Sequence, residues 1–322
     1  MSARQLVWGG FLVLLLGALG IAPQLGNDYT TSLLINLLLY ANLATAWGLF
    51  CGSTRYISLA TVAFFGVGAY TVAVLGEKMP WVWVLGVAVL VGAILALLVG
   101  LVTLRLSGTY FVIFTFGMTE LLRQIVNWYE NKVAGAVGRY VFIDGSSQHF
   151  IFYQLMFIFV LVIGLGAWLS RSRLGFELRL VGADEAAAKH CGIDTVRVKL
   201  SAFVLTSICM VLTGAVVAPR WTYIDPAIAF NSIVSFQVVI MALLGGASRF
   251  WGPLVGVIPL VLLFEILQKY FPNHFLIVLG IVFLVIVYAL PRGVVGFVDK
   301  WRLRWRKSPK PVLQAPHAGG QA

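Results

Sequence analysis

The chain has 322 residues, of which 60% are hydrophobic and only 11% are charged, with a formal net charge of +11. Soluble domains contain about 45–50% apolar and about 25% charged residues, so this composition excludes an ordinary soluble protein and predicts an all-α, polytopic transmembrane helical bundle. In such a protein, excess positive charge is explained first by cytoplasmic loops and not by nucleic acid, which we do not expect as a partner.

Apolar runs of about 17–25 residues predict about ten (eight to ten) membrane-spanning helices. In chain order they are 6–23, 33–50, 57–75, 81–105, 109–128, 150–169, 200–218, 231–245, 252–268 and 275–290. The third and eighth are short or diluted by Gly, Thr and Ser, which indicates a half-helix or a tilted segment. No clear signal-peptidase site follows the first, which we interpret as a retained helix.

Ten spans place both termini on one side of the membrane. Most of the 23 Lys and Arg residues then fall on that side, which the positive-inside rule identifies as cytoplasmic. The domain prediction is a single transmembrane unit at 1–298, which includes a polar cytoplasmic loop at 170–199. A basic, partly disordered cytoplasmic tail follows at 299–322, and its first half is expected to bind membrane lipids.

Motifs for catalysis and metal binding are absent from the sequence. The three cysteines, Cys51, Cys191 and Cys209, are scattered and the histidines do not cluster, so neither a disulfide framework nor a metal site is predicted. The sequence has no phosphate-binding loop, H-E-x-x-H, G-x-S-x-G or acidic pair spaced for acid–base work. We therefore predict a transport protein without a cofactor and not an enzyme.

The loop at 170–199 contains the stretch "GADEAAAKHCGI" at 182–193. Three alanines follow Asp184 and Glu185, whose charges suit a helix N-terminus, and Gly192 stands where a left-handed C-cap is expected, followed by Ile193. The sequence predicts a short helix ending at Cys191. Two interpretations stay open: an ordinary capped loop helix, or a surface of small side chains that a partner approaches.

Four polar residues fall inside predicted spans. Glu120, Arg123 and Asn127 share one helical face, and Glu265 lies at a similar depth in the ninth span. Charged groups within a span usually face the bundle interior or water. We therefore hypothesise that Arg123 bridges Glu120 and Glu265, in a structural role or beside the translocation pathway.

Small residues recur in the third, eighth and ninth spans and in the connection between the eighth and the ninth. Glycines at helix interfaces permit close packing, and glycines near a pathway permit a break in the backbone. Close packing is the preferred interpretation for Gly66, Gly68, Gly245, Gly246, Gly252 and Gly256.

The loop is similar to the EAA loop of ATP-binding-cassette importer permeases, with the spacing E-x-A-A-x-x-x-G-I in Glu185, Ala187, Ala188, Gly192 and Ile193. Four further patches resemble the branched-chain amino acid branch of that family, the LivM-type permeases, in the same order along the chain. They are "ISLATVAFFGVGAYTVAVL" at 57–75, "LRLSGTYFVIFTFGMTELLR" at 104–123, "LLGGASRFWGPLVG" at 243–256 and "LPRGVVG" at 290–296. One departure is Thr109, where the family often has an acidic residue.

The resemblance implies a permease subunit in the inner membrane of a bacterium. It implies four kinds of partner: a second homologous permease, two cytoplasmic ATPase subunits that dock on the loop, an extracytoplasmic solute-binding protein, and membrane lipids. The substrate would be branched-chain amino acids or a related small solute such as urea or short amides. The alternative is a secondary transporter driven by an ion gradient, for which Glu120 is the only candidate proton carrier.

Overall fold

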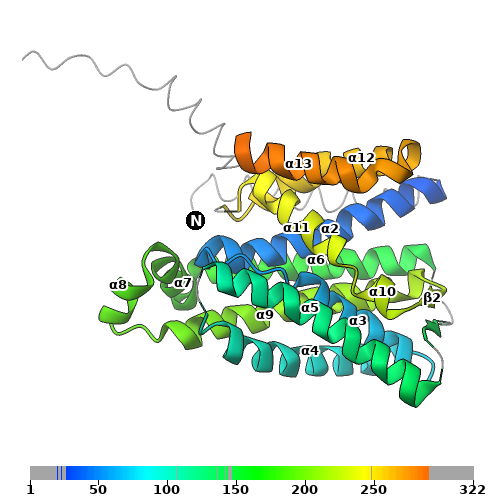
Figure 1. Cartoon of the computed structure of the whole chain (residues 1–322), viewed down its shortest axis with the longest axis horizontal. Coiled ribbons are helices and arrows are strands. Elements are labelled where there is room, and N and C mark those ends of the chain that lie inside the picture. The colour runs from blue at the N-terminus through cyan, green and yellow to red at the C-terminus, as the bar shows by residue number, and fades with distance from the viewer. Residues whose placement is uncertain are drawn as a thin grey trace, which may run out of the picture.

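The computed structural model describes residues 20, 23 and 27–289, except 107, 136, 142, 144–146 and 248. It is a bundle of helices whose long axes run roughly in one direction (Figure 1). The long helices are α2 (Asp28–Thr54), α3 (Thr61–Leu75), α4 (Trp81–Thr103), α5 (Thr109–Tyr129), α6 (Gln148–Arg171), α9 (Thr195–Val217), α11 (Ser232–Gly245), α12 (Gly252–Tyr270) and α13 (Phe275–Ala289).

Shorter elements close the two ends of the bundle. At one end, the "α8 end", lie α7 (Arg173–Ala183) and α8 (Glu185–His190). The opposite "sheet end" carries a two-stranded antiparallel sheet of β1 (Arg139–Tyr140) and β2 (Tyr223–Ile224). The remaining short elements are η1 (Glu130–Ala134), η2 (Ala218–Arg220), α10 (Pro226–Ala229) and η3 (Pro272–His274).

Nine of the ten predicted spans coincide with a described helix, and the first, at 6–23, lies almost wholly outside the described residues. Among the described residues, six segments are long and apolar enough to cross a membrane. They are Asp28–Thr54, Trp81–Thr103, Gln148–Arg171, Thr195–Arg220, Pro226–Gly245 and Gly252–Tyr270. The third and eighth spans are short as predicted, since α3 has 15 residues and α11 has 14. The basic tail at 299–322 also lies outside the described residues.

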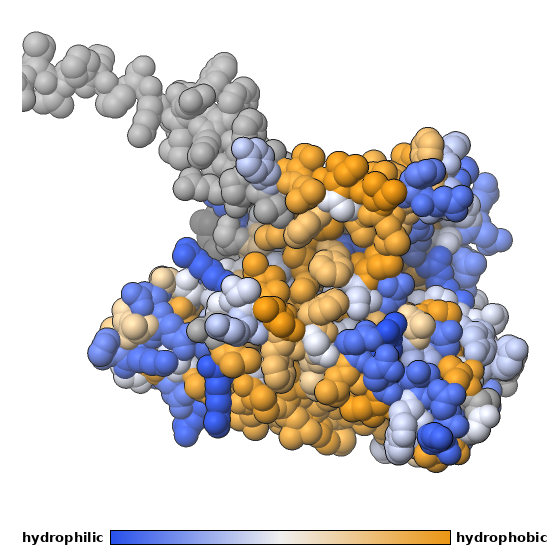
Figure 2. Space-filling view, viewed as in Figure 1, coloured by the Kyte–Doolittle hydropathy of each residue, from blue (hydrophilic) through white to orange (hydrophobic). Residues whose placement is uncertain are grey.

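The surface of the bundle is apolar in the middle and polar at both ends, as expected of a membrane protein. Figure 2 shows hydrophobic residues over the middle of the visible face, with hydrophilic residues gathered at the α8 end and at the sheet end. Large apolar side chains are exposed along α4 and α13, for example Leu98 and Leu284. Such a belt has no favourable partner in water, so the chain is an all-α membrane protein.

Helix α9 is the centre of the bundle, packed against α2, α3, α4 and α6. It approaches α3 closely because a Cβ at Gly68 would collide with the backbone carbonyl of Val211, and one at Gly214 with that of Phe65. Gly66 meets the ring of Phe230 in the same way. Glycine is therefore needed at these contacts for helix packing, as small residues are at membrane helix interfaces.

A second glycine contact joins α11 to α12. A Cβ at Gly245 would meet the carbonyl of Gly252, and one at Gly252 would meet the carbonyl of Gly246. Gly256 faces the carbonyl of Met241 at the next turn. Gly246 also ends α11 with φ at 104°, a conformation that other residues rarely adopt. The predicted packing role of these glycines agrees with their contacts.

Candidate functional site

Helix α8 is capped at both ends, and Gly192 forms the left-handed C-cap that the sequence predicts. The side chain of Asp184 accepts from the amides of Ala186, at 2.8 Å, and Ala187, at 3.1 Å. At the other end Gly192 has a φ of 80°. Its amide N–H donates to the Lys189 carbonyl, and the Ile193 amide N–H donates to the Ala188 carbonyl. These two bonds make a Schellman C-cap. The helix ends one residue earlier than predicted, at His190, with Cys191 as its cap.

The α8 helix presents one side to solvent and one to the bundle. Ala186 and Ala187 are exposed, as are His190 and Cys191. Ala188 is buried, and Ile193 packs against the hydrophobic core. The surface that remains available on α8 is therefore short, capped and formed partly by methyl groups.

Glu185, the first residue of α8, points back into the bundle. Its Oε2 accepts from the Tyr56 hydroxyl at 2.5 Å, and its Oε1 accepts from Thr195 Oγ1 at 3.2 Å. Lys199 Nζ lies 3.0 Å from the same Oε1, and Lys189 Nζ lies 3.4 Å from it. One carboxylate thus joins α8 to the α2–α3 connection and to α9.

Lys199 is the buried centre of this cluster, with only 1% of its side chain exposed. Besides Glu185, its ammonium donates to the Leu104 carbonyl at the end of α4, at 3.2 Å, and to the Tyr56 hydroxyl at 3.4 Å. It also lies 4.5 Å from the centre of the Tyr56 ring. A buried ammonium needs this many partners because removing it from water is costly.

The cluster keeps Glu185 ionised. Burial alone would raise the pKa of this carboxyl, but hydrogen bonds from Tyr56 and Lys199, the Lys199 charge and the Thr195 hydroxyl together lower the pKa to about 2. Burial and the adjacent carboxylate raise the pKa of Tyr56. The pair is therefore a fixed charge contact at neutral pH. Tyr56 and Lys199 were not predicted as site residues, although a lone lysine one turn into an apolar helix was a visible signal.

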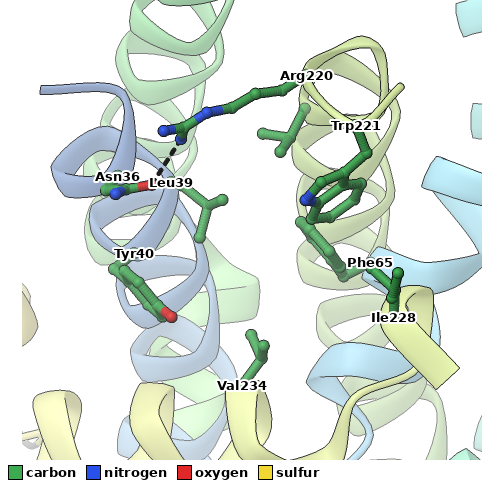
Figure 3. Close-up of a pocket in the computed structure, with 9 residues that line it drawn as sticks. Asn36, Leu39, Tyr40, Phe65, Arg220, Trp221, Ile228 and Val234 are labelled. Atoms are coloured by element: carbon green, nitrogen blue, oxygen red, sulfur yellow. Dashed lines mark hydrogen bonds between the residues drawn. The ribbon is translucent and has the colours of Figure 1, made fainter. Parts of the chain in front are cut away.

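A cavity of about 330 Å³ lies near the sheet end (Figure 3). One wall is α2 and the opposite wall is formed by α3, α9 and the residues after it, with Val234 of α11 below (Figure 3). The lining residues are Asn36, Leu39, Tyr40, Phe65, Val217, Arg220, Trp221, Ile228 and Val234. None of them was predicted as a site residue.

Arg220 reaches across the cavity to α2 (Figure 3). Its guanidinium donates to Asn36 Oδ1 at 2.6 Å and to Ser32 Oγ at 2.5 Å, both uncharged acceptors. Within the part of the chain that the structure describes, Arg220 forms no ion pair, and the Glu265 carboxylate acts on it only through space. At the far side of the cavity the Tyr40 hydroxyl donates to Gln237 Oε1 at 2.6 Å.

The polar residues inside predicted spans are arranged differently from the hypothesis. Arg123 pairs with Glu120, which also accepts from Gln124 at 3.2 Å. The bridge to Glu265 is wrong: no ion pair joins Arg123 and Glu265 among the described residues, and Glu265 lies in reach of Arg220 instead. Arg123 and Glu265 therefore face different neighbours. Asn127, near the end of α5, accepts from the side-chain amide of Asn131 in η1.

The Glu120–Arg123 pair is partly exposed on the outer side of α5, with 40% and 36% of the two side chains accessible. Helix α5 is not among the six segments that are apolar and long enough to cross a membrane. Its neighbours within the chain include α3, α10 and α11. The α5 surface therefore carries an ion pair among exposed apolar side chains such as Ile113 and Leu121.

Comparisons with known proteins agree with the helical membrane fold. Residues 29–287 match the family described as "Branched-chain amino acid transport system / permease component". The high-affinity branched-chain amino acid transport system permease protein LivM of Escherichia coli is 24% identical over 315 residues, covering 88% of this chain and 74% of LivM. LivM of Salmonella typhimurium is 24% identical over 289 residues, covering 80% of this chain and 67% of that protein.

The relatives extend beyond amino acid permeases. The L-arabinose ABC transporter permease protein AraH of Azospirillum brasilense is 28% identical over 205 residues, covering 61% of this chain and 59% of AraH. No solved structure matches the chain significantly. Since the family match covers most of the described helices and LivM aligns over nearly the whole chain, this protein belongs to the branched-chain amino acid permease family of ABC transporters and is of the LivM type.

Proposed function

We propose that this chain is a permease subunit of a bacterial ABC importer and forms part of the path for branched-chain amino acids or a related small solute, such as urea or a short amide. It would cross the inner membrane about ten times, with the α8 end and both termini in the cytoplasm. It would work with a second homologous permease, two ATPase subunits and an extracytoplasmic solute-binding protein.

The observation that carries this proposal is the Glu185–Lys199 contact at the base of α8. An ATPase that moved α8 would pull on Glu185, and through it on Lys199 of α9, Tyr56 before α3 and the Leu104 carbonyl after α4. Helix α9 packs against α2, α3, α4 and α6, so its displacement would affect the packing of the whole bundle. The loop is therefore suited to transmit motion, which a simple connector would not require.

The amino acid substrate is supported by the two LivM relatives, which align over most of the chain. The arabinose relative aligns over a shorter part and leaves the family's substrate range broader. The cavity near the sheet end has mainly apolar walls, including Leu39, Phe65 and Val234, together with a single arginine. This chemistry suits an aliphatic solute with an anionic group better than it suits a sugar.

The α5 surface is the candidate for the wall of the pathway. A partly exposed ion pair in contact with lipid would be costly, so Glu120 and Arg123 are expected to face water or another protein chain. The second permease would supply the opposite wall. On this proposal the apolar surfaces of α4 and α13 face lipid.

Purification of the tagged chain from its own membrane tests the partnership. We expect a stoichiometric complex that contains subunits with phosphate-binding loops and a second permease, identified by mass spectrometry. In proteoliposomes with the solute-binding protein, uptake of leucine should require ATP and survive collapse of the proton and sodium gradients. Uptake that needs no ATPase and follows an ion gradient would overturn the proposal in favour of a secondary transporter.

A matched pair of variants locates the docking surface. Ala187→Trp places a large ring on the exposed side of α8 and should reduce ATPase association severely. Ala167→Trp makes the same change at an exposed position of α6 and should leave association intact. Equal association of both variants would show that α8 is not the docking surface.

A further inference from the structure

We propose that the cavity between α2 and η2 is a binding site for the substrate, in which Arg220 takes the carboxylate of an aliphatic amino acid. This inference rests on the proposed transport function and assigns it a place in the chain. The cavity of about 330 Å³ lies within the range typical of small-molecule sites, about 300–1,000 Å³.

The state of the Arg220 charge is the first argument. A partly buried guanidinium usually pairs with a carboxylate, because its charge is otherwise left poorly solvated. Here its two hydrogen-bond partners, Asn36 and Ser32, are neutral, and no carboxylate of the described residues forms an ion pair with it. These contacts fix the direction of the side chain, and Glu265 acts on the guanidinium only through space, so no carboxylate in direct contact neutralises its charge. An anionic ligand in the cavity would do this.

The shape of the lining is the second argument. Below the guanidinium the cavity is bounded by Leu39, Phe65, Trp221 and Val234, which offer apolar surface to an aliphatic side chain (Figure 3). A few polar groups on a mostly apolar wall are the usual composition of a site for a small organic molecule. The combination selects a ligand with one charged end and one apolar end.

A third group suits the amino group of such a ligand. The Tyr40 hydroxyl gives its proton to Gln237, so its oxygen remains able to accept a hydrogen bond from an ammonium. Tyr40 and Arg220 both line the cavity and come from different helices. An α-amino acid would therefore lie beside α2, with its carboxylate at the Arg220 guanidinium and its ammonium toward Tyr40 (Figure 3).

The position of the cavity fits a step in translocation. Ile228 of its lining belongs to α10, which packs against α5, so the cavity lies beside the helix that carries the exposed Glu120–Arg123 pair. Arg220 directly follows α9, the helix whose other end holds Lys199. A movement of α9 driven from the α8 end would therefore displace Arg220 relative to Asn36 of α2 and weaken the site.

The test measures binding of radiolabelled L-leucine to the complete purified transporter in lipid nanodiscs, with no solute-binding protein present. We expect saturable binding that excess L-leucine displaces and L-leucinamide, which lacks the carboxylate, does not. Arg220→Gln should weaken binding by about tenfold or more, since it removes a charge-assisted contact. Arg220→Lys should retain part of the affinity.

Two further variants separate binding from folding. Val234→Trp fills the cavity without touching Arg220 and should also abolish leucine binding. Lys269→Gln removes an exposed cation of α12 outside the cavity and should leave the affinity unchanged. All variants are compared as intact complexes, checked by size-exclusion chromatography. If Arg220→Gln does not assemble, Arg220→Lys and Val234→Trp decide.

The outcomes distinguish the site from the function. Three results would overturn the site: leucinamide competes as well as leucine, Arg220→Gln binds leucine like the parent, or the parent binds no leucine. If ATP-driven leucine uptake with the solute-binding protein still proceeds in any of these cases, the proposed function stands. If no amino acid is taken up with ATP at all, the proposed function itself fails.

Discussion

The ammonium of Lys199 lies 3.0 Å from the Glu185 carboxylate and joins a surface helix to the centre of the bundle. The carboxylate belongs to the first turn of α8, and the lysine is 1% exposed on α9. Removing the Lys199 charge and removing the Glu185 charge would affect stability unequally, because Lys199 is buried and Glu185 is only partly buried. The pair therefore offers a direct way to test transmission of motion.

Glu185→Gln leaves the buried Lys199 without a counter-charge. Breaking a buried pair by removing one partner typically costs about 3–5 kcal/mol, so we expect lower thermal stability and loss of transport-coupled ATPase stimulation. The double variant Glu185→Gln with Lys199→Met removes both charges and should recover stability but not coupling. If ATP hydrolysis and transport remain coupled in the double variant, the contact only stabilises the fold and does not transmit motion from α8.

The pH dependence of this contact follows from the lowered pKa of Glu185. A carboxyl with a pKa of about 2 in the folded protein and 4.5 as its ordinary value stabilises the fold fully above pH 4.5, and loses this contribution as the pH falls toward 2. The difference in melting temperature between the parent and Glu185→Gln should therefore be constant at neutral pH and shrink between pH 4.5 and 2. A difference that shrinks between pH 6 and 8 would contradict it.

Gly192→Val tests the cap of α8. Valine at a φ of 80° costs about 1–2 kcal/mol, because its Cβ crowds the following carbonyl. No neighbouring atom lies close to this position, so the cost is local and the bundle should still assemble. We expect intact assembly with reduced coupling between ATP hydrolysis and uptake. Gly192→Asn, which tolerates the left-handed conformation better, is the control and should couple nearly as the parent does.

What the sequence predicts well here is local. Apolar run length depends on neighbours in the chain, and nine predicted spans coincide with helices. Capping likewise depends on residues three or four apart, so the sequence predicts Gly192 correctly as the C-cap of α8.

What the sequence does not predict is which faces of separate helices meet. Tyr56 and Lys199 are 143 positions apart, and Arg220 and Asn36 are 184 apart, so their contacts exist only after the helices pack. The predicted bridge from Arg123 to Glu265 is wrong for this reason, because two residues predicted at the same depth can lie on helix faces that do not meet. The two clusters of greatest functional interest are contacts of this kind.

The close approach of α3 to α9 gives the last prediction. A methyl group at Gly68 would collide with the Val211 carbonyl, and backbone atoms cannot turn aside as a flexible side chain can. Gly68→Ala should therefore lower stability by about 1–3 kcal/mol, the usual cost of overpacking, and reduce the yield of assembled protein. Gly86→Ala on α4 is the matched control, because its added methyl meets no atom within 4 Å and alanine favours helix. The readout is the melting temperature in detergent with size-exclusion profiles. Equal melting temperatures for the two variants would show that α3 and α9 separate without cost, and that the centre of the bundle lies elsewhere.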